Sequence, residues 1–319
     1  MLNYIGHRLL QALPVLFLAS IPVFLILHLA PGDPAILLAG EDATDEDIEV
    51  IRQYLGLDQP LVIQYGTWLG RVLQGDFGIS FYVQGASVTQ LIMQRLPATL
   101  ELAIIGLLLA IVISVPLGII AALKRNRWPD HLIMGASTVS IAIPNFWLGI
   151  LMLLVFALWL DWLPAGGRPV SFMEDPLTNL RFVILPAFTL SLFSAAVLVR
   201  FVRASMMEVL HQDYIRTAYS KGLGFRTIVY KHALRNALIP TITALGVQLG
   251  QLLTGTIVLE MVFSWPGLGQ LILGAIMGRD YQLVQGCILI FVVIFVLVNL
   301  VTDLIYGLVD PRISVSGRN

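Results

Sequence analysis

Side chains that could carry out chemistry are few in this sequence and lie far apart. Its histidines fall in four different segments at no metal-ligand spacing. They are His7, His28, His131, His211 and His232. The single cysteine, Cys287, lies in an apolar run, so neither an intrachain disulfide nor a cysteine-based metal site is expected. The sequence holds no G-x-x-x-x-G-K-S/T nucleotide loop, no H-E-x-x-H and no G-x-S-x-G. We therefore expect a chain that catalyses no reaction and binds no metal or cofactor itself.

Acidic side chains inside a membrane span could move protons and so drive transport. Here Glu101, Glu260 and Asp303 lie near the ends of apolar runs instead. They form no obvious chain for proton relay. A self-driven secondary transporter is therefore the less favoured interpretation.

The most distinctive charged stretch extends from Asp213 to Asn236, between two apolar runs. Asp213 is a plausible N-cap for a helix over 214–221 that ends at Gly222. A second helix is predicted from residue 225, and its spacing gives it one face. That face consists of Phe225, Ile228, Val229, His232, Ala233 and Asn236. Such short helices are marginal in water, so the protein's own inner surface, a partner beneath the membrane or anionic lipid headgroups should hold them.

The rest of the chain has the composition of a protein in a lipid bilayer. Of its 319 residues, 57% are hydrophobic and 12% are charged, about half the charge of a soluble domain. A helix needs about 20 apolar residues to cross the hydrocarbon core. Six runs qualify: 9–30, 98–123, 132–160, 182–199, 237–259 and 283–309. We interpret the first as a retained anchor because it is longer than the ~7–15 apolar residues of a signal peptide. The fold class is therefore all-α, with six transmembrane helices.

The distribution of cationic residues predicts the orientation of these helices. With the N-terminus inside, 13 of the 19 Lys and Arg residues lie in cytoplasmic segments, as the positive-inside rule requires. Both termini are therefore expected in the cytoplasm, with 1–30 holding the first helix and 310–319 forming a tail. The net charge of -1 gives no indication of a nucleic acid partner.

Residues 31–97 form a predicted extracytoplasmic region after the first helix. The region holds nine of the 20 acidic residues. Ile48, Ile51, Leu55 and Leu57 predict a short amphipathic helix that ends near Gly56. The region is either a solvated helical cap or a surface that meets an extracytoplasmic partner. Within the third apolar run, Pro144 is expected to kink a helix.

Several sequence blocks resemble the membrane subunits of bacterial ABC importers. Their general signature is E-A-A, three residues, G, nine residues, I-x-L-P; here Ala218, Gly222 and Leu234 keep that pattern, while Arg216 and Arg235 replace its glutamate and proline. The peptide and nickel branch has its own version, D-Y-x-R-T-A-x-x-K-G-L followed by H-x-L-R-N-A, which this chain carries over 213–237. Further blocks occur in the family's order: "PGDP", "LGLDQPL", "GDFGIS", "LPATLEL", "RASM", "SWPGLG" and "DPRI".

The resemblance implies a type I ABC importer permease fold, with a permease core over 98–309 and a cytoplasmic coupling loop over 205–236. In this family that loop sits in a cleft of a separate ATPase. The residues so assigned are Asp213, Tyr214, Arg216, Thr217, Ala218, Lys221, Gly222, Leu223, His232, Leu234, Arg235 and Asn236. The implied partners are a second homologous permease, two cytoplasmic ATPase subunits that use ATP and Mg, and an extracytoplasmic substrate-binding protein. The implied location is the bacterial inner membrane.

The resemblance leaves two substrate classes. The block at 213–223 is similar to dipeptide, oligopeptide or glutathione importers. "QYGTWL" at Gln64, "PNFWL" at Pro144 and "DWLPAGG" at Asp161 are as similar to nickel importers. Peptide is the favoured substrate, and nickel or another metal chelate is the alternative.

Overall fold

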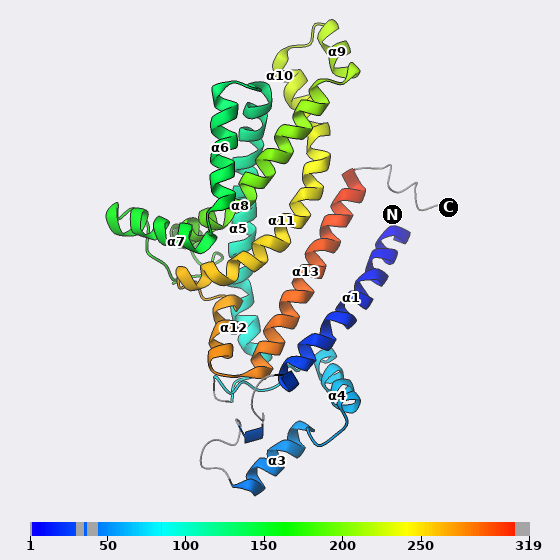
Figure 1. Cartoon of the computed structure of the whole chain (residues 1–319), viewed down its shortest axis with the longest axis vertical. Coiled ribbons are helices and arrows are strands. Elements are labelled where there is room, and N and C mark those ends of the chain that lie inside the picture. The colour runs from blue at the N-terminus through cyan, green and yellow to red at the C-terminus, as the bar shows by residue number, and fades with distance from the viewer. Residues whose placement is uncertain (1, 30–34, 37–43, 84, 310–319) are drawn as a thin grey trace. The chain divides into compact units, whose positions relative to one another are not determined.

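The computed structural model describes residues 2–29, 35–36, 44–83 and 85–309, which are mostly helical (Figure 1). The helices are α1 (Leu2–Leu29), α3 (Asp45–Leu55), α4 (Leu61–Leu73), α5 (Val88–Leu123), α6 (Trp128–Ala142), α7 (Asn145–Met152), α8 (Pro176–Leu210), α9 (Asp213–Ser220), α10 (Phe225–Thr227), α11 (Leu234–Val262), α12 (Leu268–Met277) and α13 (Tyr281–Val309). Two π-helical segments, η1 (Leu153–Trp159) and η2 (Ile228–Ala233), complete them. The predicted tail, the "PGDP" and "DPRI" blocks and residues 37–43 lie outside the described part, in whole or in part.

Within the described residues, five helices are long and apolar enough to cross a membrane, judged by length and composition. They are α1, α5, α8, α11 and α13, and they contain five of the six predicted apolar runs almost completely. The remaining run is divided into two helical pieces, α6 and the continuous stretch formed by α7 and η1. If these two pieces are taken as one broken span, they make a sixth. The predicted all-α membrane fold is confirmed.

The third predicted span is broken rather than kinked. α6 ends at Ala142 and α7 begins at Asn145, and the two directions differ by 105°. Pro144 explains the break because its ring disfavours helical geometry in the preceding residue. Ile143 is accordingly extended, with φ -83° and ψ 126°. The interruption predicted at Pro144 is therefore present, as a break larger than the expected kink.

The chain packs as two compact units, which are described separately. Unit 1 comprises Met1–Leu9, Ala98–Pro266 and Leu297–Asn319, and unit 2 comprises Leu10–Pro97 and Gly267–Val296. The boundary at 97 and 98 is also where the sequence separated the outer region from the permease core. Residues 267–296, assigned to that core by sequence, pack with 10–97 instead.

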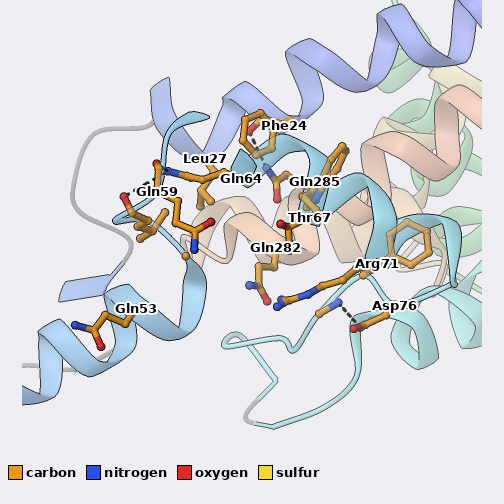
Figure 2. Close-up of a pocket in the computed structure, with 15 residues that line it drawn as sticks. Phe24, Leu27, Gln53, Gln59, Gln64, Thr67, Arg71, Asp76, Gln282 and Gln285 are labelled. Carbon is orange, nitrogen blue, oxygen red and sulfur yellow. Dashed lines mark hydrogen bonds between the residues drawn. The ribbon is translucent and has the colours of Figure 1, made fainter. Parts of the chain in front are cut away.

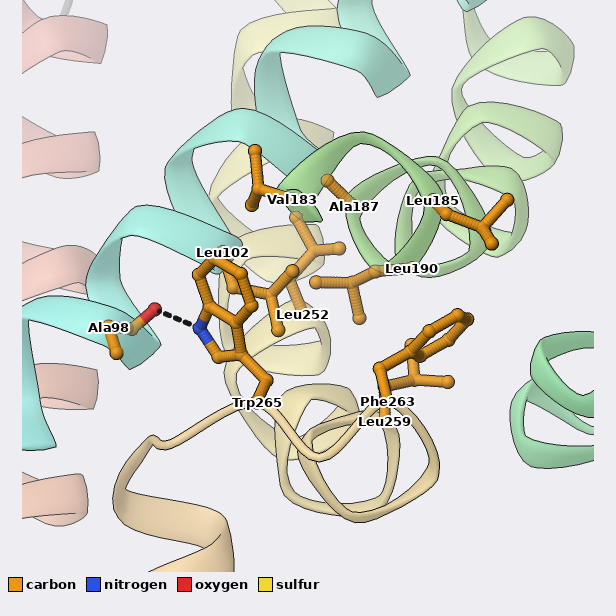
Figure 3. Close-up of a cluster of buried hydrophobic side chains, with 10 residues drawn as sticks. All are labelled: Ala98, Leu102, Val183, Leu185, Ala187, Leu190, Leu252, Leu259, Phe263 and Trp265. Atoms are coloured by element: carbon orange, nitrogen blue, oxygen red, sulfur yellow. Dashed lines mark hydrogen bonds between the residues drawn. The ribbon is translucent and has the colours of Figure 1, made fainter. Parts of the chain in front are cut away.

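A cluster of buried side chains around Trp265 forms one core of unit 1 (Figure 3). Its indole Nε1 donates a hydrogen bond of 2.8 Å to the carbonyl oxygen of Ala98, which satisfies the ring's polar atom. The apolar partners come from α5, α8 and α11. They are Leu102, Val183, Leu185, Ala187, Leu190, Leu252 and Leu259, together with Phe263. Three helices far apart in sequence are thereby joined.

The N-terminus of α8 is capped by Asp175. Its Oδ1 accepts hydrogen bonds of 3.1 Å from the backbone N–H groups of Leu177 and Thr178. Its Oδ2 accepts one of 2.6 Å from the Thr178 hydroxyl. These bonds, the hydroxyl's above all, hold the pKa of the Asp175 carboxyl below its usual value. The cap thus fixes the residue at which α8 begins.

In unit 2, a buried carboxylate anchors the segment that follows α4. Asp280 Oδ2 accepts hydrogen bonds from the Ser80 hydroxyl (2.6 Å), the Phe81 N–H (2.8 Å) and the Tyr82 N–H (3.0 Å). Its Oδ1 accepts one of 3.0 Å from the Leu283 N–H in the first turn of α13. The side chain is fully buried. One residue therefore ties residues 80–82 to the start of α13.

Candidate functional site

The charged stretch singled out in the sequence folds as a helical loop, defined here as residues 211–236. It consists of α9, a short turn, α10, η2 and the first three residues of α11, and therefore leads without a break into the rest of α11. Residues 205–210 of the predicted coupling loop belong to α8 itself. Figure 1 shows α9 and α10 beyond the ends of α6 and α8. The helical loop therefore caps one end of unit 1.

The first helix of the loop begins one residue earlier than predicted. Gln212 is the N-cap residue, with φ -73° and ψ 148°, and its side chain makes no capping hydrogen bond. Asp213, predicted to be the cap, is the first helical residue and forms an exposed ion pair of 3.6 Å with Arg216. Aspartate is favoured both at the cap and in the first turn, where it faces the positive end of the helix dipole. Composition alone could not separate these two positions.

The turn after α9 has the two hydrogen bonds of a Schellman motif. The N–H of Gly222 donates to the carbonyl of Tyr219 (2.9 Å), and that of Leu223 donates to the carbonyl of Ala218 (3.3 Å). Gly222 has a φ of +75°, which costs glycine little and other residues more. A Cβ added there would meet no atom within 4 Å. Backbone conformation, and not space, therefore requires glycine at the predicted position.

Substitutions at Gly222 test whether the turn requires the left-handed backbone conformation. We expect Gly222→Ala to destabilise the chain by about 1–2 kcal/mol, since an L-residue must adopt the left-handed conformation. Gly222→Asn should cost less, because asparagine tolerates this conformation better. Thermal unfolding of the purified chain measures the difference. Equal stability of Gly222→Ala and the unmodified chain would show that the turn does not depend on this conformation.

The apolar face of the helical loop packs against the protein's own helices. Within the loop, Ile215, Ala218, Ile228, Val229 and Ala233 are buried. Their neighbours in the same cluster come from α5, α8 and α11, and they are Ile119, Ala122, Val202, Met206 and Ala237. The sequence left open what holds the two short helices. In this structure unit 1 itself buries one face of each.

The second helix of the loop does not keep the predicted periodicity. Ile228, Val229 and Ala233 of the predicted face are buried, whereas Phe225 and Asn236, at its two ends, are exposed. For Asn236 the cause is η2, because a π-helix closes its hydrogen bonds over one more residue than an α-helix. Phe225 precedes η2 and is the first residue of α10. The buried face consequently continues at Ala237. This part of the predicted face is wrong.

The helical loop also exposes large apolar side chains, with cations near them in the sequence. They are Tyr214, Tyr219, Leu223, Phe225 and Tyr230, and we call them the aromatic ridge. The exposed cations around them are Arg216, Lys221, Arg226, Lys231 and Arg235. Exposed tyrosine, phenylalanine and arginine are typical of surfaces that bind other proteins. The sequence prediction included Tyr214 and Leu223 but missed Tyr219, Phe225 and Tyr230, although their aromatic character between buried positions was a usable signal.

The predicted site residues are distributed between this exposed side and the buried face. Exposed are Asp213, Tyr214, Arg216, Thr217, Lys221, Gly222, Leu223, Arg235 and Asn236. Ala218 is buried, while His232 and Leu234 are half-buried. The Asn236 amide donates a hydrogen bond of 2.9 Å to the Tyr214 hydroxyl, which joins the two helices of the loop. The structure thus brings the two ends of the predicted motif together.

An ion pair braces the end of unit 1 from which the loop emerges. Arg203 on α8 donates to both carboxylate oxygens of Asp130 on α6, through Nε (2.6 Å) and a terminal nitrogen (2.8 Å). The Asn126 N–H also donates to Asp130, over 2.9 Å. Such two-pronged arginine contacts fix direction as well as distance. The turn between α5 and α6 is thereby fixed to α8, close to the loop.

The described part of the chain shows no group of side chains arranged for catalysis. Within those residues, no three His, Cys, Asp or Glu side chains are grouped as a metal site would need. The features that stand out are a buried face, an exposed aromatic ridge and five exposed cations. This arrangement is suited to binding another protein.

Two family comparisons cover nearly the whole chain. Residues 114–315 match the family described as binding-protein-dependent transport system inner membrane component. Residues 1–103 match the N-terminal family of such membrane components. The chain is 45% identical over 313 residues to the glutathione transport system permease protein GsiC of Escherichia coli strain K12, covering 98% of this chain and 99% of that protein. GsiC of Shigella flexneri serotype 5b matches with the same identity and coverage.

A comparison with solved structures agrees on the fold. The inward-facing MetNI methionine ABC transporter matches with a TM-score of 0.58, over 69% of this chain and 97% of that chain, at 18% identity. This likeness supports the predicted type I ABC importer permease fold. The chain belongs to the family of binding-protein-dependent transport system inner membrane components, as a multi-pass permease subunit of an ABC importer in the dipeptide, oligopeptide and nickel branch.

Proposed function

We propose that the helical loop is the element through which this permease couples to separate ATPase subunits. The observation that carries the proposal is the aromatic ridge: its five apolar side chains remain exposed while the other face of the same helices is buried. Exposed apolar side chains among cations indicate a binding surface. The predicted site residues on this surface are the proposed contacts, with Tyr219, Phe225 and Tyr230 added to them.

The packing of the loop suggests how movement would pass to the membrane helices. Ile215 and Ile228 are fully buried against α5 and α8, and the loop continues into α11. Close-packed interiors transmit displacement instead of absorbing it. An ATPase pair that closes on ATP would therefore move the inner ends of these helices and favour one conformation of the pathway. A ligand shifts such an equilibrium only by its differential affinity for the two states.

The proposed assembly has the subunits that the family requires. It comprises a second, homologous permease, two cytoplasmic ATPases that use ATP and Mg, and an extracytoplasmic substrate-binding protein. The lipid bilayer surrounds the permeases, and nucleic acid has no part in it. Co-purification with the neighbouring gene products would test the composition. A chain that transports alone in proteoliposomes under an ion gradient would instead be a self-driven transporter.

The proposed substrate is glutathione or a di- or oligopeptide. The support is the 45% identity, over nearly the full length, to permeases named for glutathione transport. Nickel or a metal chelate is the second candidate because three sequence blocks resemble nickel importers. Uptake in cells lacking this gene distinguishes them. Loss of glutathione and dipeptide uptake with normal nickel uptake is the expected result, and the reverse loss would exclude peptide.

The proposed orientation places the helical loop and both termini in the cytoplasm. The single native cysteine, Cys287, is buried, so an introduced cysteine can be labelled selectively. In intact spheroplasts, a membrane-impermeant maleimide should label Met173→Cys but not Ser220→Cys. Met173 is 96% exposed, and Ser220 lies on the exposed side of α9. Labelling of Ser220→Cys before permeabilisation would reverse the orientation.

A further inference from the structure

A cavity of about 230 Å³ lies within unit 2, lined by α1, α4, the start of α13 and the segments on either side of α4 (Figure 2). It is smaller than the ~300–1,000 Å³ of sites for drug-sized ligands. Five glutamines line it, more than any other residue type: Gln53, Gln59, Gln64, Gln282 and Gln285. The aromatic ridge and its cations belong to unit 1. The cavity is therefore separate from the proposed coupling surface.

Three of the glutamines are held in place by the backbone. Gln285 Nε2 donates to the carbonyls of Val23 (3.2 Å) and Phe24 (3.0 Å) in α1. Gln64 Nε2 donates to the carbonyl of Gln59 over 2.7 Å, and Gln282 Oε1 accepts from the Ile79 N–H over 3.0 Å. One end of each amide is thus fixed before any ligand arrives. Preorganised polar groups of this kind reduce the entropy lost on binding.

In two of these amides, the second polar atom remains available to bind a ligand. No described residue pairs with the Nε2 group of Gln282 or the Oε1 atom of Gln285. The first is a donor and the second an acceptor. Together they can bind one amide group of a ligand through its carbonyl oxygen and its N–H.

One cation and one anion also line the cavity. Figure 2 shows the Arg71 side chain extending toward Gln282. Asp76 accepts a hydrogen bond of 2.9 Å from the Gly78 N–H. Neither has an oppositely charged partner within ion-pair distance among the described residues. Arg71 can bind a carboxylate through two parallel N–H groups, and Asp76 can accept from an ammonium group.

Aromatic rings form an apolar wall beside these polar groups. Phe24 and Trp68 both line the cavity, and their ring centroids are 5.6 Å apart. Phe24 also contacts Tyr65, with centroids 5.4 Å apart, which fixes the ring from behind. Such a wall can bury a small apolar side chain.

We propose that this cavity binds a small zwitterion that contains an amide group, of the size of a dipeptide. Its carboxylate would bind Arg71, its ammonium group Asp76, and its peptide bond the free ends of Gln282 and Gln285. Its side chain would lie against Phe24 and Trp68. A zwitterionic lipid headgroup shares the two charges but lacks the peptide bond and side chain, so it uses fewer of these groups. The existence of this site does not depend on ATPase coupling.

Calorimetric titration of the full chain in lipid nanodiscs with glycyl-leucine tests the site. No ATPase and no binding protein are present, so failure here leaves the proposed coupling function untouched. We expect saturable binding that Arg71→Met weakens at least about tenfold, the effect of losing a charge-assisted hydrogen bond. Asp76→Asn should weaken it similarly. N-acetyl-glycyl-leucine amide, which has neither charge, should bind far more weakly.

Arg279→Met is the matched control, because Arg279 is an exposed arginine of the same unit that does not line the cavity. It should bind glycyl-leucine like the unmodified chain. Thermal unfolding of each variant confirms that it is folded. The proposal is overturned if glycyl-leucine shows no saturable binding, or if Arg71→Met binds as well as Arg279→Met. Binding of glycerophosphoethanolamine in preference to glycyl-leucine would also overturn it, and would assign the cavity to a lipid headgroup.

Discussion

Phe225→Asp is expected to abolish ATP-dependent uptake while the chain remains folded in the membrane. Phe225 is 55% exposed and is one of the five side chains of the aromatic ridge. A carboxylate placed in a protein interface must lose its water, and an unpaired buried charge costs several kcal/mol. The free chain should tolerate the change, since the residue starts a helical run, where an anion is favoured.

Two measurements separate coupling from folding in this variant. Co-purification of ATPase subunits with the permease reports docking, and thermal unfolding reports stability. Phe172→Asp is the matched control: Phe172 is 43% exposed and lies in the segment between η1 and α8, away from the helical loop. It should retain both ATPase binding and uptake. Normal uptake by Phe225→Asp would exclude the aromatic ridge from coupling.

Asp280→Ala is expected to be the most destabilising of the substitutions considered. The carboxylate is fully buried and accepts four hydrogen bonds, three of them from residues 80–82. Its removal leaves those four donors without their acceptor, at a cost of about 3–5 kcal/mol in the free energy of unfolding. We expect the segment at 80–82 to detach from α13 and become accessible to protease.

The control for this substitution is Asp58→Ala, which removes an exposed aspartate of the same unit. Its effect should be within about 0.5 kcal/mol, as for most surface substitutions. Asp280→Asn should fall between the two, because its remaining oxygen can still accept. Denaturant unfolding in detergent, with limited proteolysis between residues 76 and 88, measures both effects. If Asp280→Ala were as stable as Asp58→Ala, the carboxylate would not anchor this segment.

The membrane helices and the helical loop were accessible to prediction because their signals are local. Long apolar runs locate spans without reference to the rest of the fold. The short helices around Gly222 followed from a glycine turn and from apolar spacing within 24 residues. The exact helix boundaries were predicted less well where the same residue type is compatible with two local structures. Pro144 could kink or break a helix, and Asp213 could cap α9 or begin it.

Other features depend on residues far apart in the chain, and no local pattern predicts them. The four donors that surround Asp280 include three about 200 positions away. The division into two units joins 267–296 to 10–97, which a linear reading assigned to separate regions. The π-helical turn of η2 leaves Asn236 exposed and Ala237 buried, against the expected 3.6-residue period. Packing against α5 and α8, rather than the sequence of η2 alone, selects which side is buried.

Binding of an ATPase to the helical loop is tested most directly by the labelling rate of a single cysteine on the exposed side of the loop. Ser220→Cys replaces one small polar side chain by another, and native Cys287 is buried. Maleimide reaction of Ser220→Cys should be rapid in the purified permease and strongly slowed in the assembled transporter. The rate at Met173→Cys should be the same in both. If Ser220→Cys reacted equally fast in the assembled, ATP-hydrolysing complex, the loop would not be the docking element.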